Sequence, residues 1–288
     1  MSSVIQVGDC TIHKIVEFEY PFVAALAYFP SLSEEVLAAN REWLVPHALD
    51  VHDYVIHSFH AYVVQTPHHT ILIDSCVGDL KDRARPEWHR KTGGTFLRSL
   101  AAGGFTPESI DYVMCTHLHS DHVGWNTQLV DGRWVPTFPR ARYIFAQGEY
   151  DFWLDRHRSK PIACMDDSVL PIVEAKRAEL VSGHHEVGDH LRLAPTPGHT
   201  PHHSAVYLGR DRIAAAFTGD LIHSPLQTRY PELSMRSDFD QAQAAVTRRS
   251  FLETCFSERA LVCTAHFPDP SFGRLDRWDS GFILRALC

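Results

Sequence analysis

The sequence predicts a layered fold of the α/β or α+β class, in which helices cover β-sheets. Three observations indicate it: β-rich runs end at turn residues, stretches with helical spacing follow several of these runs, and a hydrophobic content of 44% suits a packed core. No low-complexity stretch or linker divides the 288 residues. We therefore expect one domain that spans residues 1–288.

Two hairpins are predicted near the amino terminus. Residues 4–17 alternate loosely between apolar and polar side chains around a Gly-Asp pair, which is typical of a hairpin. Residues 62–64 and 71–73 are β-rich runs that flank a turn containing proline. This second hairpin should end at Asp74.

Residues 18–53, between the hairpins, are less regular and rich in aromatic residues and prolines. They indicate an ordered excursion rather than a flexible linker. The excursion could form a lid over an apolar substrate, with Phe22, Phe29 and Trp43 as the candidates, because small-molecule pockets are lined mainly by apolar and aromatic groups. The alternatives are a homodimer surface and ordinary packing.

A strand is predicted at residues 111–115. It is preceded by a helix at residues 96–102, which Gly103-Gly104 ends, and by a short helical turn that begins at Thr106-Pro107. The apolar residues of the strand lead directly into a run of histidines. The strand should therefore deliver those histidines to its carboxyl end.

The second half of the chain repeats the alternation of strand and helix. A strand at 142–145 precedes a helix at 148–156, and residues 169–180 have helical spacing of apolar side chains. One long helix is predicted at residues 239–256. The remaining predicted elements are four short strands, at residues 191–193, 204–208, 212–217 and 260–264.

The charge of the chain excludes some function classes. A formal net charge of -8 argues against a sequence-independent nucleic-acid binder, which needs a basic footprint. No stretch approaches the length of an apolar membrane span, and residues 1–4 lack the features of a secretory signal. We expect a cytoplasmic protein that acts on a small-molecule substrate, without nucleic-acid or membrane partners.

The seven cysteines are scattered and form no Cys-x-x-Cys pair, so we expect them to be reduced. Cys115 and Cys263 lie in apolar runs, where cysteine is commonly a small buried hydrophobe. Several histidines lie in polar turns and are expected to be exposed. These are His68, His69, His184, His185 and His190.

The segment Thr116–His122 carries the strongest chemical signal. His117, His119, Asp121 and His122 place three imidazoles and a carboxylate within six residues. Such ligands suit a borderline divalent ion such as Zn²⁺, and the local lack of a thiolate argues against a closed structural zinc site. The chain is therefore predicted to be a metalloenzyme with an open site.

One short loop can begin two metal sites. Extended backbone sends residues two apart to the same side, so His117 and His119 can bind one ion while Asp121 and His122 face another. Three further segments follow predicted strands and end a turn of small residues with a ligand type. They are Thr196–His199, Phe217–Asp220 and Thr264–Phe267.

These segments together resemble the metallo-β-lactamase superfamily over nearly the whole chain. The resemblance rests on the spacing His-x-His-x-Asp-His at 117–122, on the later His199, Asp220 and His266, on the strand ending at Asp74, and on the glycine-histidine turn at 195–201. It implies an αββα sandwich with two ions at one edge of the paired sheets.

The resemblance also implies the role of each ligand. His117, His119 and His199 would hold the first ion, Asp121, His122 and His266 the second, and Asp220 would bridge them. A metal-bridging hydroxide would then hydrolyse the substrate without a protein nucleophile. Zinc is the default for both ions, with manganese, iron and cobalt as alternatives.

Three further residues have roles that the sequence leaves less defined. Asp121 would also carry a proton to the leaving group, as general acid-base catalysis by a ligand. Asp74 resembles a residue that orients a ligand histidine, although a turn-capping aspartate would look the same. His223 could donate a hydrogen bond to a substrate oxyanion, or merely pack beside the metals.

The predicted substrate class follows from the segment Gly219–His223. In the quorum-sensing lactonase branch a tyrosine usually stands three residues after the bridging aspartate, where this chain has His223. This segment, with Gln227, His266-Phe267-Pro268 and Gly273, resembles instead the branch of organophosphate and aryl-ester hydrolases. His202 is a second departure, because a glycine commonly precedes the histidine matched by His203.

We therefore predict a dinuclear hydrolase that cleaves a small lactone, carboxylic ester or related organophosphate or aryl ester. A thiolesterase resembling glyoxalase II is one alternative, but the basic substrate-binding tail of that family is not evident. A mononuclear iron persulfide dioxygenase, which uses fewer ligands, is another. A catalytically silent binding module is disfavoured by the intact ligand set.

Overall fold

The computed structural model describes residues 4–286, which form two compact units of interleaved segments. The first unit holds the chain up to Phe18 and Phe59–Gly188, and the second holds Glu19–Ser58 and the chain from Asp189 onward. Each unit thus consists of two segments that are separated in the sequence. One domain over residues 1–288 stays a prediction.

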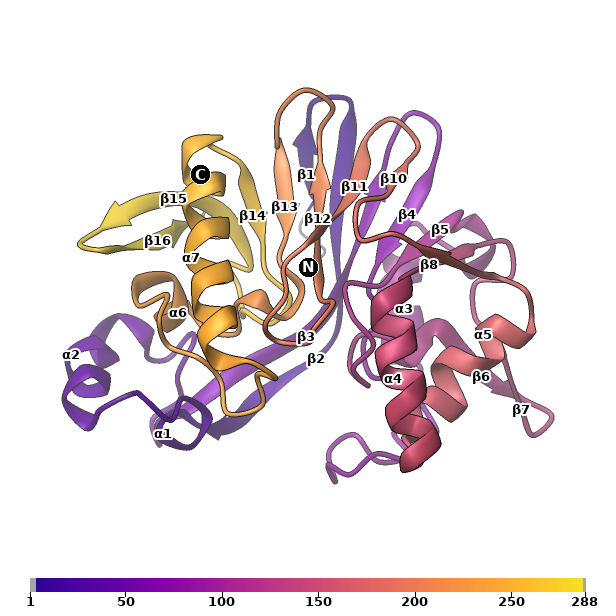
Figure 1. The fold of residues 1–288 in the computed structure, drawn as a ribbon, viewed down its shortest axis with the longest axis horizontal. Coiled ribbons are helices and arrows are strands. Elements are labelled where there is room, and N and C mark those ends of the chain that lie inside the picture. The colour runs from indigo at the N-terminus through magenta and orange to yellow at the C-terminus, as the bar shows by residue number, and fades with distance from the viewer. Residues whose placement is uncertain (1–3, 287–288) are drawn as a thin grey trace. The chain divides into compact units, whose positions relative to one another are not determined.

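A seven-stranded mixed sheet lies mostly in the first unit (Figure 1). Its strands follow the order β1 (Val4–Val7), β2 (Cys10–Ala24), β3 (Tyr54–Gln65), β4 (Thr70–Ile73), β5 (Tyr112–Met114), β8 (Arg142–Ala146) and β9 (Ala178–Val181). The pairs β1–β2 and β3–β4 are antiparallel, which confirms both predicted hairpins. The strands from β4 to β9 are parallel.

Helices and short turns complete the first unit. They are α3 (Thr95–Ala102), η1 (Pro107–Ser109), η2 (Gly124–Asn126), α4 (Gln147–Ser159), η3 (Met165–Val169) and α5 (Leu170–Glu174), together with the small hairpin of β6 (Thr127–Val130) and β7 (Arg133–Pro136). Phe96 of α3 and Tyr150 of α4 pack against Val113 of β5 and Phe145 of β8 in one hydrophobic core. This core holds β5 in place and so positions the loop that follows it.

The predicted helix at 169–180 is wrong in its second half. Helix α5 ends at Glu174, and β9 follows at Ala178–Val181. Between them Lys176 adopts a left-handed backbone conformation with φ 56°, which interrupts the helix. The apolar residues of this segment are thus divided between α5 and β9.

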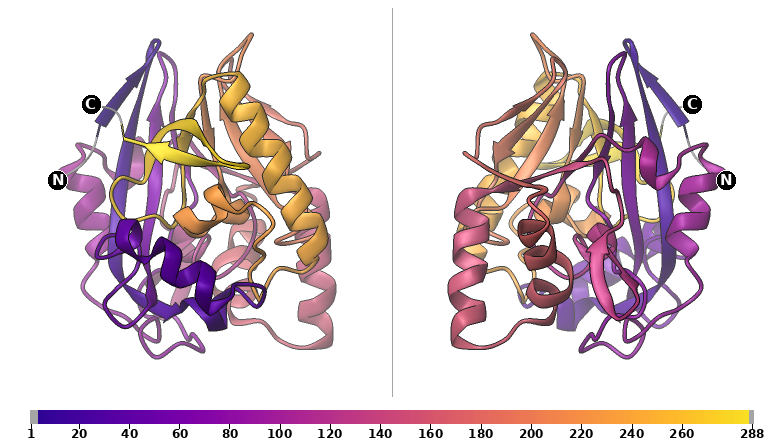
Figure 2. Two further views of the ribbon diagram at one scale, coloured as in Figure 1. Left: turned by 90° about the vertical axis from the view of Figure 1, so that its left-hand side faces the viewer. Right: turned by 90° about the vertical axis from the view of Figure 1, so that its right-hand side faces the viewer.

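A second seven-stranded sheet lies mostly in the second unit. Its order is β10 (Glu186–Val187), β11 (Leu191–Pro195), β12 (Ser204–Leu208), β13 (Ala215–Phe217), β14 (Leu261–Cys263), β15 (Phe272–Trp278) and β16 (Gly281–Arg285). Helix α7 (Gln241–Ser257) runs beside these strands (Figure 2) and buries Phe251, Leu252 and Cys255 in one core with Val262. The helices η4 (Gly219–Leu221) and α6 (Pro225–Arg229) precede α7.

The excursion at 18–53 is more regular than predicted. Strand β2 continues to Ala24, and the helices α1 (Ala25–Tyr28) and α2 (Glu34–Leu44) follow it. Phe29 is fully buried in a core of the second unit, and Phe22 and Trp43 pack against that core. Ordinary packing therefore accounts for Phe29.

Burial confirms one expectation about the scattered residues and corrects another. Cys115 and Cys263 are buried and free, and burial raises the pKa of the Cys115 thiol well above its ordinary value. His190, predicted to be exposed, is only 7% exposed. It lies just before β11, and its backbone carbonyl accepts a hydrogen bond from the N–H of Gly209 at 2.8 Å, which ties it to the sheet.

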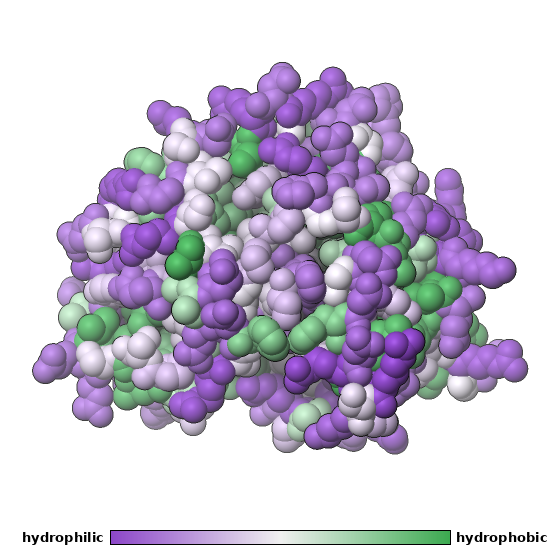
Figure 3. All heavy atoms as spheres, in the orientation of Figure 1, coloured by the Kyte–Doolittle hydropathy of each residue, from purple (hydrophilic) through white to green (hydrophobic). Residues whose placement is uncertain are grey.

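The surface is mainly polar. Figure 3 shows hydrophilic side chains over most of the drawn face, with smaller hydrophobic areas among them. Within residues 4–286, no helix combines the length and the apolar character that a membrane crossing would need.

Candidate metal centre

The end of β4 fastens the Thr116–His122 loop to the sheet. Asp74 follows β4 in a left-handed conformation with φ 58°. Its carboxylate accepts hydrogen bonds from the Thr116 backbone N–H at 2.8 Å and from the Thr116 hydroxyl at 2.9 Å. The loop therefore leaves β5 in a direction set by its neighbouring strand.

The four predicted ligands of this loop lie together. The Nε2 atom of His117 is 2.9 Å from Nδ1 of His119, and the rings of His117 and His122 are 4.2 Å apart. Oδ2 of Asp121 lies 3.8 Å from Nε2 of His122. Asp74 reaches the other nitrogen of the same ring, because its Oδ2 is 2.9 Å from Nδ1 of His122. Asp74 thus makes the contact with a ligand histidine that was predicted.

Two residues of α4 support the loop from its other side. The carboxylate of Glu149, which is buried, accepts hydrogen bonds from the Leu118 backbone N–H at 3.2 Å and from Nε1 of Trp153 at 2.6 Å. The Trp153 ring meets the His119 ring edge to face at 5.1 Å. Sequence reasoning missed both residues, and their only signal was their spacing of four on a helix.

The remaining ligand candidates lie in the second unit, where Asp220 connects them. Its Oδ1 lies 2.9 Å from Nε2 of His266, and its Oδ2 lies 3.2 Å from Nε2 of both His199 and His223. All four side chains are buried. His203 holds the backbone of Asp220, because its Nε2 accepts the Asp220 N–H at 3.0 Å.

A tight turn places His199. Gly198 has φ 139°, and a Cβ atom there would lie 2.4 Å from the Cα atom of Ala244 in α7. The carbonyl groups of Gly198 and His199 accept hydrogen bonds from the N–H groups of Asp240 and Phe239 just before α7. Only glycine permits this close approach of turn and helix.

Asp238 is a buried residue that sequence reasoning missed. Its Oδ1 lies 2.9 Å from Nδ1 of His199, and its Oδ2 accepts the Met235 N–H at 2.9 Å and lies 3.6 Å from Nη2 of Arg248. Burial raises the pKa of Asp238, but the contacts with His199 and the charge of Arg248 outweigh it and lower the pKa below its ordinary value. The side chain is therefore ionised.

Aromatic rings contact the buried histidines around Asp220 in the second unit. His57 lies between Phe22 at 4.6 Å and His266 at 4.8 Å, with nearly parallel ring planes. The ring of His223 is 5.9 Å from Tyr28 and perpendicular to it. His57 carries no motif, so the sequence did not indicate it.

The donor groups fit divalent ions in both chemistry and charge. The atoms that face one another are imidazole nitrogens and carboxylate oxygens, and Asp220, His223 and His266 by themselves form one group of potential ligands. Burial lowers the pKa of His199, but the carboxylates of Asp220 and Asp238 together raise it to about 9. This site therefore favours a positive charge, which a bound cation supplies.

The orientation of the imidazoles also suits metal binding. One nitrogen of His122 is held by Asp74, one of His199 by Asp238, and one of His117 lies 3.1 Å from the Thr116 hydroxyl. Ligand histidines usually have such a partner on the nitrogen that does not bind the ion. The seven predicted ligands thus lie in two groups, one in each unit.

A family model described as the metallo-beta-lactamase superfamily matches residues 60–266. Curated relatives include an N-acyl homoserine lactonase from a Bacillus species, 28% identical over 170 residues, which are 57% of this chain and 58% of the relative. An N-acyl homoserine lactonase from Bacillus thuringiensis is 27% identical over 143 residues, covering 46% of this chain and 50% of the relative. The chain thus spans about half of the length of these relatives.

Solved structures share the fold over the whole chain. The hydrolase AbOPH of the beta-lactamase superfamily has a TM-score of 0.82 at 24% identity, covering 100% of this chain and 98% of the other. AidC, a dizinc quorum-quenching lactonase in complex with N-hexanoyl-L-homoserine, has a TM-score of 0.79 at 18% identity, covering 100% and 97%. The predicted fold class, an αββα sandwich, is confirmed.

Proposed function

This chain belongs to the metallo-β-lactamase superfamily, and from that premise we propose that it hydrolyses a small lactone, a carboxylic ester or a related organophosphate or aryl ester. The observation that carries the proposal is the set of largely buried imidazoles and carboxylates that lie within ligand distance of one another. The curated relatives are lactonases, which favours the hydrolysis of an ester bond.

We propose that the seven residues hold two divalent ions, zinc by default. A dizinc structure with the same fold supports the number of ions. Two such ions lower the pKa of water and polarise the carbonyl or phosphoryl oxygen of a substrate. Three buried partners would keep proposed ligands in place. Asp74 would hold His122, Asp238 would hold His199, and His203 would hold Asp220.

The proposed proton carrier is Asp121. Its carboxylate is the most exposed of the four carboxylates around the ligand histidines, at 13% of its side-chain area, and its Oδ2 lies near Nε2 of His122. We propose that this oxygen accepts a proton and delivers it to the leaving group. Asp220, in contrast, is enclosed by three imidazoles and serves as a ligand.

His223 is proposed to donate a hydrogen bond to the substrate oxygen on which charge develops. Burial lowers its pKa more than Asp220 raises it, so the ring is neutral and carries one N–H. A neutral hydrogen-bond donor that is already in place in a buried site can stabilise an oxyanion as its charge develops. The histidine at this position favours an ester or phosphotriester over a homoserine lactone, because the sequence lacks the tyrosine typical of the lactonase branch.

One experiment tests the reaction class. Metal analysis of the purified full-length protein is combined with hydrolysis assays on lactones, aryl esters, phosphotriesters, thiolesters and β-lactams. We expect two ions per chain and turnover of the lactones, aryl esters or phosphotriesters. One iron per chain without hydrolysis would favour the persulfide dioxygenase, and turnover of thiolesters alone would favour a protein resembling glyoxalase II.

Replacing Asp220 by Ala should abolish turnover and lower the metal content, because this carboxylate contacts three imidazoles of the group. The measurements are the turnover number and the metal content per chain after dialysis. Asp240→Asn is a matched control, since the Asp240 side chain caps α7. Unchanged activity in Asp220→Ala would refute a bridging role.

Replacing His223 by Phe should reduce turnover by about a hundredfold, the usual effect of losing one oxyanion donor, while both ions are retained. Phenylalanine preserves an aromatic ring beside Tyr28, so the packing changes little. The comparison requires the turnover number and the metal content of the same preparation. Normal turnover by His223→Phe would show that His223 is not needed as a hydrogen-bond donor.

A further inference from the structure

A surface cleft in the first unit lies along α4, the helix whose Glu149 and Trp153 contact the ligand loop. It has a volume of ≈ 740 Å³ and is lined by the carboxyl half of α4 and the residues after it. Its apolar lining comes from Phe152, Trp153 and Ile162, and its basic groups are Arg156 and Lys160. Over α4, hydrophilic and hydrophobic side chains lie side by side (Figure 3).

Trp153 connects this cleft to the candidate metal centre. The same indole that lines the cleft contacts the ring of His119 at 5.1 Å. Its Nε1 donates to Glu149, which also accepts from the backbone N–H of Leu118 in the ligand loop. A molecule in the cleft therefore lies one side chain away from a predicted metal ligand.

The cleft carries a net positive charge, although the chain as a whole is acidic. Asp155, its one lining carboxylate, forms an ion pair with Arg158 at 3.0 Å. The guanidinium of Arg156 lies over the rings of Phe152 at 5.3 Å and Trp153 at 5.8 Å. Within residues 4–286, neither Arg156 nor Lys160 has a carboxylate at salt-bridge distance, so both cations are available to a ligand.

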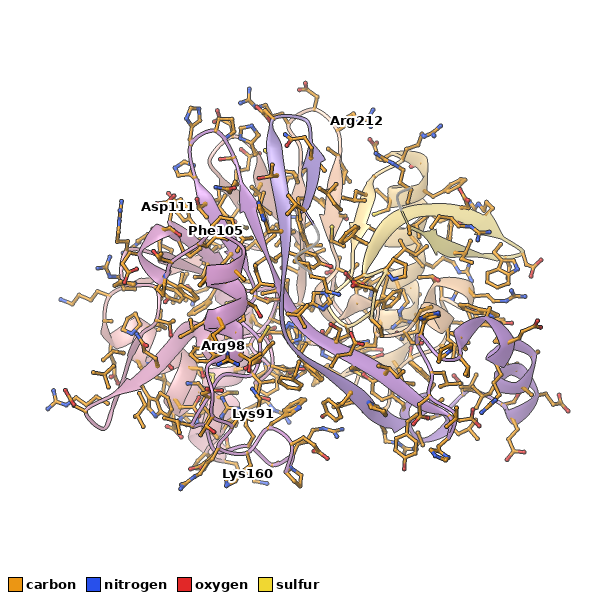
Figure 4. All side chains as sticks on the ribbon, turned by 180° about the vertical axis from the view of Figure 1, so that it is seen from behind. Lys91, Arg98, Phe105, Asp111, Lys160 and Arg212 are labelled. Atoms are coloured by element: carbon orange, nitrogen blue, oxygen red, sulfur yellow. The ribbon has the colours of Figure 1, made fainter. Side chains whose placement is uncertain are left out.

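The two cations occupy different parts of the cleft. Arg156 belongs to the last turn of α4, and its guanidinium is drawn over the aromatic floor. Lys160 lies just past the carboxyl end of the helix (Figure 4) and is exposed. A group bound against Phe152 and Trp153 would thus lie in a cleft that both cations line.

From this combination we propose that the α4 cleft binds a part of the substrate that is aromatic or apolar and carries a negative charge. Arg156 and Lys160 would determine the specificity for that charge. The inference rests on the proposed hydrolase function and adds the charge of the substrate to it. Aromatic and apolar walls bind the body of such a molecule, and a few placed charges select its orientation. The enzyme would prefer esters that carry a negative charge away from the scissile bond.

Binding of a matched pair of probes tests the cleft independently of turnover. Naphthalene-2-sulfonate and the neutral naphthalene-2-sulfonamide are titrated calorimetrically into the zinc-loaded full-length protein. We expect the sulfonate to bind more tightly, and Arg156→Gln and Lys160→Gln each to weaken it by about threefold, the effect of losing one exposed charge contact. The double variant should bind both probes alike, and added NaCl should weaken only the sulfonate.

Arg98→Gln is the matched control, because Arg98 is an exposed arginine on α3, another helix of the first unit, and does not line the cleft. Thermal unfolding of every variant verifies that α4 is intact. Equal binding of the two probes by wild type, or a loss in Arg98→Gln as large as that in Arg156→Gln, would overturn the proposal. So would full sulfonate binding by the folded double variant.

A second pair of compounds joins the cleft to catalysis. For the wild type, the KM for 4-acetoxybenzoate should be lower than the KM for 4-acetoxybenzamide. The double variant should have a higher KM for 4-acetoxybenzoate only, with the same kcat. An equal KM for both esters would count against the cleft as a substrate site. If the wild type hydrolyses neither ester nor any other substrate of the panel, the proposed function fails, whereas the sulfonate titration still decides whether the cleft binds anions.

Discussion

At the scale of single residues, the hydrogen-bond partners of the candidate ligand histidines hold their rings in place. His199 is held through Nδ1 by Asp238 at 2.9 Å, while its Nε2 faces Asp220. His122 has the corresponding partner in Asp74. A ring fixed in this way has already lost its rotational freedom before an ion arrives, so less entropy is lost on binding.

Asp238→Asn should therefore weaken metal binding by about tenfold to a hundredfold, as is common when the partner of a ligand histidine is changed. The amide can still contact His199 but lacks the charge that favours a cation there. Zinc affinity is measured by competition with a chromogenic chelator, with Asp240→Asn as the control two residues away. Equal zinc affinity in the two variants would show that Asp238 only supports the local fold.

The sequence predicted the ligands but not their partners. His117, His119 and His122 follow a spacing that the chemistry of metal binding requires, so they can be recognised in a linear chain. Asp238 and Glu149 have no fixed spacing from the residues they hold, because they reach them through the packing of separate elements. Only the tertiary structure could identify them.

At the scale of elements, the ends of buried strands and the turns after them position the chemistry. The turn at Gly198 passes so close to α7 that a Cβ atom would lie 2.4 Å from the backbone N and Cα of Ala244. The same turn carries His199 and is held by hydrogen bonds to the residues before α7. The position of His199 therefore depends on how the turn at Gly198 packs against α7.

Gly198→Ala should destabilise the protein by about 3 kcal/mol, since the new methyl group meets backbone atoms that cannot yield. Gly132→Ala is the control, because Gly132 also has a positive φ, 75°, but nothing lies within 4 Å of the point that its new methyl group would occupy. That variant should lose only about 1 kcal/mol. Urea unfolding measures both values, and equal losses would show that strain, not contact, limits position 198.

Most elements that the sequence indicated are present, and the failures have a local cause. The hairpins, α3, β5, α4 and α7 have strong periodicity or clear turn residues. The hairpin of β15 and β16 was missed, because exposed arginines and aspartates break its apolar pattern at this edge of the sheet. Residues 169–180 were assigned to one helix because apolar spacing cannot show a backbone break.

At the scale of the whole molecule, buried charge affects stability. Lys81 is fully buried, donates to the Thr127 hydroxyl at 2.7 Å, and lies 3.5 Å from Asp167, which Arg83 also binds. Burial lowers the pKa of Lys81 from 10.5 to about 7, against the opposing effect of Asp167. The folded protein therefore releases this proton at a lower pH than the unfolded chain does.

Between pH 7 and 10.5 the unfolded chain binds more protons at this lysine, so the free energy of unfolding should rise with pH through this window. The slope is at most about 1.4 kcal/mol per pH unit. Lys81→Met should remove this contribution, and Lys160→Met, at an exposed lysine, should not. The measurement is urea unfolding from about pH 7 to about pH 8, a range that stays below the ordinary thiol pKa of about 8.5. Parallel curves for wild type and Lys81→Met would contradict the assigned pKa.

By itself the sequence determined the fold class and the order of most elements, and it predicted a ligand set, because hydrophobic periodicity and ligand spacing are local properties of a chain. The tertiary structure decided what surrounds those ligands: Asp238 beside His199, Glu149 and Trp153 beneath the loop, and a basic cleft along α4. These features depend on contacts between segments that are distant in sequence. Their spacing is set by packing, and the sequence pattern alone carries no record of it.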